Sequence, residues 1–73
     1  MQMFLYHAQV QHRDGTIENI ILNAVDSVAA CHTAREGLSQ DGVTGHYAKS
    51  AKKVSKAKAY KLVDAGARQW ASI

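Results

Sequence analysis

The first part of the chain alternates apolar and polar residues and predicts a β-hairpin. Between Met3 and Gln11 the alternation has a period of two, which is typical of a strand with one buried face. Asp14-Gly15 follows, and this pair predicts a type I′ turn, in which both central residues need a positive φ. The two faces of the strand are Phe4, Tyr6, Ala8 and Val10 against His7, Gln9 and Gln11, with Leu5.

A second strand is predicted over about residues 16–24. Its isoleucines fall on both faces, with Ile20 on one and Ile17 and Ile21 on the other. A strand with two apolar faces is central in its sheet or has its outer face covered. The sequence leaves open whether Ile17 and Ile21 are instead exposed and pair two copies of the chain, so a monomer or a homodimer is expected.

A helix is predicted after this hairpin. Asp26 or Ser27 can accept hydrogen bonds from the first free N–H groups of the helix. The helix is expected to run through Glu36 and to stop at Gly37, with Leu38 folding back in a Schellman ending. Its narrow apolar face consists of Ala30, Cys31, Ala34 and Leu38.

The rest of the chain is read as a loop followed by strands. Residues 39–45 contain Gly42 and Gly45 and predict the loop. Residues 47–57 fit a helix by composition, but that helix, continued, would bring Lys58 into its own apolar side, so a lysine-rich edge strand over 46–54 is favoured. A turn near 55–58, a strand over 59–64, a turn at 65–66 and a closing strand over 67–73 complete the prediction. The fold expected for residues 1–73 is a single α+β domain, an antiparallel sheet with one helix on one face, in the order ββαβββ.

Charge is distributed very unevenly along the chain. The net charge is +3, yet residues 1–48 sum to −3 and residues 62–73 to zero. Residues 49–61 carry +6 and contain no acid. This asymmetry favours a polyanionic or acidic partner, although a lysine run can also serve only to keep a surface soluble. The candidate partner-binding or nucleic-acid-binding residues are Lys49, Lys52, Lys53, Lys56, Lys58 and Lys61.

Catalytic and metal-binding patterns are not found in the sequence. The four histidines have no metal-ligand spacing with each other or with Cys31, and no phosphate-binding loop follows the glycines. Cys31 and His32 are neighbours on a predicted helix, so their side chains diverge and do not form a nucleophile–base pair. We therefore expect no enzyme activity, no cofactor and no metal, with Cys31 as a small core residue.

The location expected from the sequence is the cytoplasm, which for a phage-encoded protein is the host cytoplasm. The start Met-Gln-Met-Phe-Leu-Tyr-His lacks the basic region and the apolar length of a signal peptide. No segment approaches the roughly 20 apolar residues that span a bilayer. A single cysteine is typical of a reducing compartment.

Two kinds of binding are compatible with the lysines. They could neutralise phosphates of DNA or RNA without reading sequence, with Tyr47 and Tyr60 placed to stack on bases. They could instead hold acidic residues or bound phosphates on a host protein or a protein–RNA complex.

The second kind is suggested by a resemblance. In size, charge and element order, from the Arg-Asp-Gly-Thr hairpin to the final Gly-Ala-Arg-Gln-Trp, the chain resembles small phage-encoded accessory proteins and is similar in layout to small anti-CRISPR proteins that block type I surveillance complexes. The resemblance implies a non-catalytic inhibitor that binds a protein–RNA complex near the entry path of target DNA. The lysine segment would be its contact. Sequence-nonspecific binding of nucleic acid is the alternative.

Overall fold

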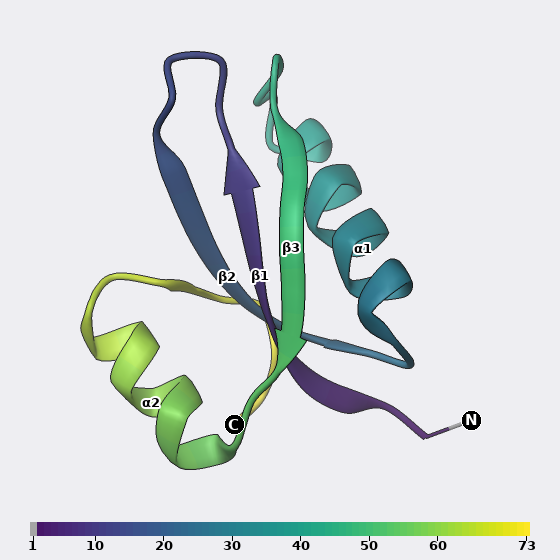
Figure 1. Ribbon diagram of the computed structural model, residues 1–73, viewed down its shortest axis with the longest axis vertical. Coiled ribbons are helices and arrows are strands. Elements are labelled where there is room, and N and C mark those ends of the chain that lie inside the picture. Colours follow the sequence, from purple (N-terminus) through teal and green to yellow (C-terminus); the bar gives the residue numbers. More distant parts are fainter. Residues whose placement is uncertain (1) are drawn as a thin grey trace.

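The computed structural model describes residues 2–73 and shows an α+β fold, as predicted. Within these residues four strands form one sheet, with α1 on one face and α2 on the other (Figure 1). The predicted order ββαβββ is corrected to ββαβαβ, because a second helix replaces a predicted strand. The elements are β1 (Phe4–Gln11), β2 (Ile17–Ala24), α1 (Ser27–Gln40), β3 (Tyr47–Lys53), α2 (Lys56–Asp64) and β4 (Arg68–Gln69).

The sheet is mixed rather than purely antiparallel. Its strand order is β3-β1-β2-β4, so the two long strands of the hairpin are central. β1 pairs antiparallel with both β2 and β3, whereas β4 runs parallel to β2. The closing strand predicted over 67–73 is therefore too long. The strand observed there, β4, has two residues and pairs as Ile20–Arg68 and Ile21–Gln69.

The hairpin turn lies where Asp14-Gly15 predicts it, but it is of another type. Gly15 N–H donates to His12 O at 2.9 Å, and His12 N–H donates to Thr16 O at 2.8 Å. Gly15 has φ +90°, whereas no residue other than glycine has a positive φ in residues 2–73. A type I turn followed by a left-handed glycine fits this three-residue loop, and it spares Asp14 the strained conformation that type I′ requires.

The core between α1 and the sheet follows the alternation seen in the sequence. The Asp26 side chain caps α1 by accepting from Ala29 N–H at 2.8 Å, as predicted. The inner face of the helix contributes small residues and one leucine, so the helix packs closely on the strands. The buried residues of this core are Tyr6, Ala8, Val10, Ile20, Leu22, Ala24, Ala30, Ala34 and Leu38.

The predicted end of α1 at Gly37 is wrong, because the helix continues to Gln40. Leu38 is fully buried in the core, and its burial holds the chain in the helix for a further turn. Gly37 faces the ring of Trp70, and a Cβ atom at this position would lie 2.6 Å from that ring. The glycine therefore serves a close contact rather than a helix stop.

β3 confirms the edge strand predicted over 46–54, but the strand predicted over 59–64 is helix α2. Ser55 begins this helix, since its hydroxyl accepts from Lys58 N–H at 3.2 Å. In a helix over residues 47–57, continued, Lys58 would have fallen on the apolar side. In α2, which begins at Lys56, Lys58 is exposed. The second core, on the α2 face, consists of Ile21, Ala59 and Ala71 with Leu5, Val54, Leu62, Val63, Ala67 and Ile73 packed around them.

The covering of β2 by α2 explains the isoleucines on both faces of that strand. Ile21 is fully buried in the second core and is unavailable for pairing two copies, whereas Ile17 is partly exposed. Within residues 2–73, neither helix has the length and apolar character needed to cross a membrane.

Candidate functional site

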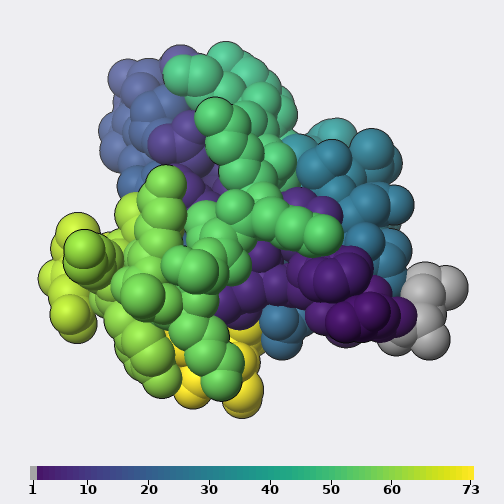
Figure 2. Space-filling model, turned by 60° about the horizontal axis from the view of Figure 1, so that its bottom comes forward, coloured from purple at the N-terminus to yellow at the C-terminus, as the bar shows by residue number. Residues whose placement is uncertain are grey.

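The six lysines singled out by the sequence lie on two consecutive elements. Half of them belong to β3 and half to α2, and the two elements are separated only by Val54 and Ser55. Figure 2 shows β3 and α2 together on the side of the molecule that faces the viewer. All six side chains are exposed. We refer to Lys49, Lys52, Lys53, Lys56, Lys58 and Lys61 as the lysine surface.

On β3 the lysines point to both faces of the sheet. Lys52 is opposite His7, on the α2 face, whereas Lys53 is opposite Tyr6, on the α1 face. The Nζ atom of Lys53 lies 3.7 Å from the centre of the Phe4 ring, within the range of a cation–π interaction. The lysine surface therefore wraps around an edge strand and does not form one flat patch.

On α2 the lysines occupy the sides that the sheet does not cover. Lys58 and Lys61 are three residues apart and are neighbours on the helix surface. Lys56 lies one turn before Tyr60, whose hydroxyl donates to Ile73 O at 3.1 Å. The opposite side of the helix, with buried Ala59, packs on the sheet, so these cations face solvent.

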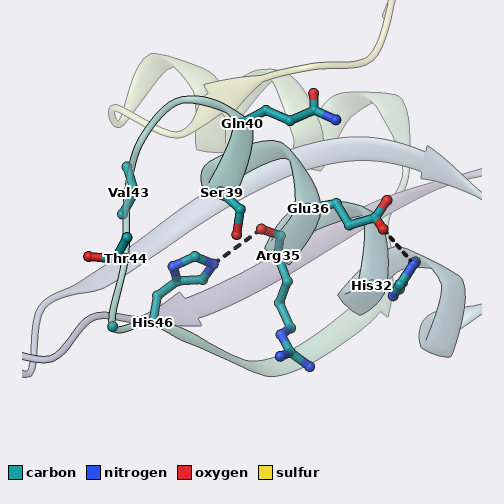
Figure 3. A pocket seen from close by; sticks show the side chains of 9 residues that line it. His32, Arg35, Glu36, Ser39, Gln40, Val43, Thr44 and His46 are labelled. Atoms are coloured by element: carbon teal, nitrogen blue, oxygen red, sulfur yellow. Dashed lines mark hydrogen bonds and ion pairs between the residues drawn. The ribbon is translucent and has the colours of Figure 1, made fainter.

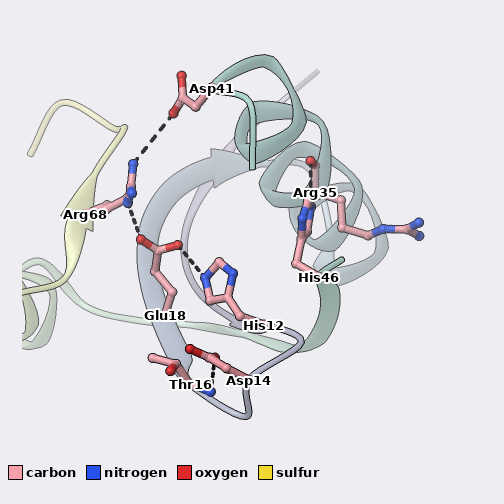
Figure 4. A network of polar contacts seen from close by, with 8 residues as sticks. All are labelled: His12, Asp14, Thr16, Glu18, Arg35, Asp41, His46 and Arg68. Carbon is pink, nitrogen blue, oxygen red and sulfur yellow. Dashed lines mark hydrogen bonds and ion pairs between the residues drawn. The ribbon is translucent and has the colours of Figure 1, made fainter. Parts of the chain in front are cut away.

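Five of the six acids lie elsewhere in the molecule, and the sixth, Asp64, is the last residue of α2. Figure 4 shows Arg68 between two carboxylates, one from Glu18 on β2 and one from Asp41, which caps the end of α1. The other carboxylate oxygen of Glu18 lies 3.0 Å from His12 Nε2. Among residues 2–73, none of the lysines takes part in an ion pair. The cations of the lysine surface are thus available to an external anion.

The hairpin holds a carboxyl group with a shifted pKa. The carboxylate of Asp14 accepts from Thr16 N–H at 2.9 Å, and this hydrogen bond lowers the pKa of Asp14 below its ordinary value of 3.8. A hydrogen bond with the Thr16 side chain and the nearby His12 act in the same direction. Asp14 lies at the tip of the hairpin, so this effect concerns the turn and not the lysine surface.

A shallow pocket of about 620 Å³ lies between the outer side of α1 and the loop that leads to β3 (Figure 3). His46 reaches into it and donates from Nε2 to Arg35 O at 3.2 Å, while His32 pairs with Glu36 at 3.1 Å along the helix. Within residues 2–73 no group of three or more potential metal ligands comes together. The pocket is wide open. His32 and the Nε2 atom of His46 have partners, whereas the buried Nδ1 atom of His46 has no hydrogen-bond partner within residues 2–73.

Cys31 is only partly buried, whereas the sequence predicts a core residue. It lies next to Ala30, on the edge of the apolar face of α1, and it forms no disulfide. Its neighbour His32 is exposed and turned toward Glu36. The divergence expected for adjacent helix residues is therefore present.

The sequence did not reveal one group of residues that the fold brings together. They are polar side chains of three strands on the α2 face of the sheet, beyond the part that α2 covers. The polar side of the alternation over residues 3–11 was visible in the sequence. Which residues of β2 and β3 lie beside it depends on the strand register, which the sequence does not give. We call this group the polar face; it consists of His7, Gln9, Gln11, Asn19, Tyr47 and Ser50.

Comparison of the chain with known protein families, with curated proteins and with solved structures found no match.

Proposed function

We propose that this protein is a small non-enzymatic binding protein that docks on an anionic macromolecular partner through the lysine surface. The observation that carries the proposal is the separation of charge. Six exposed lysines lie on β3 and α2 and form no ion pair with any of residues 2–73, whereas five of the six acids lie on the hairpin and α1 side. Unpaired cations at this density attract and orient an anionic partner.

The partner that we propose is a host protein or protein–RNA complex, which this protein would inhibit by occupying an anionic surface. This narrower role is supported by the resemblance to small anti-CRISPR proteins in size and charge. The expected setting is the host cytoplasm, and no membrane partner is proposed. Direct, sequence-nonspecific binding of DNA or RNA is the second candidate, and it is favoured by the half-exposed ring of Tyr47 beside the lysines.

A capture experiment with two charge-matched variants tests the docking role. Lys52→Glu/Lys56→Glu alters the lysine surface, while Arg13→Glu/Arg35→Glu alters two exposed arginines on the hairpin and α1. Each substitution removes one positive charge and adds one negative charge, so both variants change from +3 to −1. The tagged proteins are used to capture partners from a bacterial lysate with and without nuclease.

The lysine variant is expected to lose the captured partner, while the arginine variant keeps it and both remain folded by circular dichroism. A partner lost from both variants alike would mean that net charge alone matters and would contradict the proposal. Loss of the partner after nuclease treatment identifies nucleic acid as the ligand, and its persistence identifies a protein. Affinity for nucleic acid through this surface should fall steeply with salt.

A further inference from the structure

The α2 face of the sheet is closed at one end and open at the other. Near Leu5 and Ile21 it is covered by α2, but further along β1 toward the hairpin it carries polar side chains. In Figure 2 the purple surface of β1 is visible between the green surface of β3 and the yellow-green surface of α2. This open part is the polar face, and lysines of β3 and α2 flank it.

Hydrogen bonds hold the side chains of the polar face in place. Asn19 Oδ1 accepts from His7 Nε2 at 2.7 Å and from Gln9 Nε2 at 3.2 Å. Ser50 Oγ donates in turn to Gln9 Oε1 at 3.3 Å. These contacts fix the orientation of the Asn19 amide, since both acceptor positions of its oxygen are used. Its Nδ2 donors then have no partner within residues 2–73 and are available to a ligand.

A β-bulge brings the one aromatic ring of the polar face into position. The register between β1 and β3 shifts between Gln9 and Val10, so that Lys49 is an extra residue in β3. Without the shift, Tyr47 would share a face with Ala51, on the α1 side, because side chains alternate along a strand. With it, Tyr47 lies opposite Gln11, and its hydroxyl donates to Gln11 Oε1 at 2.7 Å. Bulges often re-aim a side chain in this way next to functional sites.

The charge of this face suits an anionic ligand. Lys52 lies opposite His7 on the same face of the sheet. Glu18, by contrast, is opposite Val10, and its carboxylate is held by Arg68 and His12 on the α1 side. No acid of β1, β2 or β3 lies on the polar face.

We propose that the polar face binds single-stranded nucleic acid, with an unstacked base against Tyr47, base edges at the free donors of Asn19 and Gln11, and phosphates at Lys52 and neighbouring lysines. This inference deepens the second candidate function, direct binding of nucleic acid, and rests on it, since the lysine surface supplies the attraction to phosphate. A duplex meets the lysines but keeps its bases paired and stacked, so it gains nothing from the polar face. A half-exposed aromatic ring beside cations is the usual arrangement for holding single strands.

Binding is measured by fluorescence anisotropy with labelled oligo(dT) and oligo(U) of about 12 nucleotides, and with a DNA duplex of the same length. Tyr47→Ala removes the ring, and Tyr47→Phe keeps it as the matched control. Asn19→Asp preserves the acceptor for His7 and Gln9 but replaces the amide donors by a negative charge. Asn23→Asp is its matched control: it is exposed, lies on the same strand, and is about 13 Å from Asn19.

We expect either single strand to bind about tenfold more tightly than the duplex. Tyr47→Ala and Asn19→Asp should each weaken binding of single strands about tenfold, while Tyr47→Phe and Asn23→Asp stay within about twofold of the natural protein. The salt dependence should be unchanged in Tyr47→Ala, because that variant removes no phosphate contact. A difference between oligo(dT) and oligo(U) would show which of the two backbones the site favours.

Equal affinity for single strands and duplex, unaltered by the polar-face variants, would overturn this inference and leave binding to the lysine surface alone. Absence of binding to every probe at low salt would also overturn it. The proposed function is then judged separately, by whether Lys52→Glu/Lys56→Glu loses a protein partner in the capture experiment. Circular dichroism of each variant separates loss of binding from loss of the fold.

Discussion

The two faces of the sheet differ in how they are covered and in the charge around them. The α1 face is sealed by a helix of 14 residues over a core of fully buried side chains, with acids at its margins. The α2 face is covered by a helix of nine residues whose one buried side chain is Ala59, and its remainder is polar and flanked by lysines. We therefore expect the α1 face to contribute most of the stability, whereas the α2 face leaves polar and charged side chains exposed.

The first prediction compares equivalent truncations on the two faces. Leu38 is fully buried under α1, whereas Leu62 on α2 is only partly buried. Leu38→Ala should lower the free energy of unfolding by about 3 kcal/mol and Leu62→Ala by about 1 kcal/mol, since the cost grows with how deeply the removed methyl groups are buried. Both replace leucine by alanine within a helix, so helix propensity is matched.

Urea unfolding followed by circular dichroism measures both variants. A chain of this size has a total stability of roughly 4 to 11 kcal/mol, so loss of Leu38 removes a large part of it. Equal costs for the two leucines would show that the faces share the stability evenly.

The second prediction concerns the contact that ties the end of the chain to α1. Gly37→Ala places a methyl group where the Trp70 ring lies, at 2.6 Å, so the ring must move. We expect a loss of about 1 kcal/mol in the free energy of unfolding, because the clash outweighs the gain in helix propensity.

A double-mutant cycle sharpens this prediction. In a Trp70→Ala background the clash is absent, and Gly37→Ala should instead stabilise the protein by up to about 1 kcal/mol. The same sign of effect in both backgrounds would rule out the ring of Trp70 as the reason for glycine at this position.

The smallest effect is expected at the hairpin. Because the pKa of Asp14 is lowered in the folded state, its ionised form stabilises the fold above the ordinary pKa of 3.8, and this contribution is lost as the pH falls through the lowered value. Asp14→Asn keeps an acceptor for Thr16 N–H but does not titrate, so its stability should fall less steeply with acid. An NMR titration of the Asp14 carboxyl carbon should give a pKa below 3.8, and a value at or above 3.8 would contradict the hydrogen-bond explanation.

Most of the α1 face of the sheet could be predicted from the sequence, whereas helix α2 and the polar face beside it could not. Alternation over residues 3–11 and the cap at Asp26 predicted the hairpin, the start of α1 and its apolar face, because these depend on local patterns. Isoleucine on both faces of β2 also predicted a central, covered strand correctly.

What failed depends on contacts between distant residues. Residues 59–63 satisfy both a strand and a helix pattern, and the helix is decided by the cap at Ser55 together with the packing of Leu62 and Val63 beside Ile21. Gly37 predicts a helix end from the sequence alone. Its actual role, making room for the ring of Trp70, is visible only in the folded chain. Tyr47 joins the polar face only because of the register shift between β1 and β3, and the pattern of apolar and polar residues gives no sign of that shift. The six lysines lie on the consecutive elements β3 and α2, while their role as a contact stays a prediction.

The short pairing of β4 has a consequence for motion. α2 and the last residues are joined to β2 by a parallel pair of two residues and by Trp70 and Ala71 N–H groups that both donate to Ile21 O. Besides these backbone bonds, the segment is held by the Arg68 ion pairs, the Trp70 ring and the small second core. Because its backbone bonds to the sheet are few, we expect residues 56–73 to open locally and their amides to exchange with solvent faster than those of β1 and β2. Such an opening uncovers Ile21 and Leu5 while the α1 core stays intact. Hydrogen exchange is therefore expected to show residues 56–73 opening as one unit while the amides of β1 and β2 stay protected.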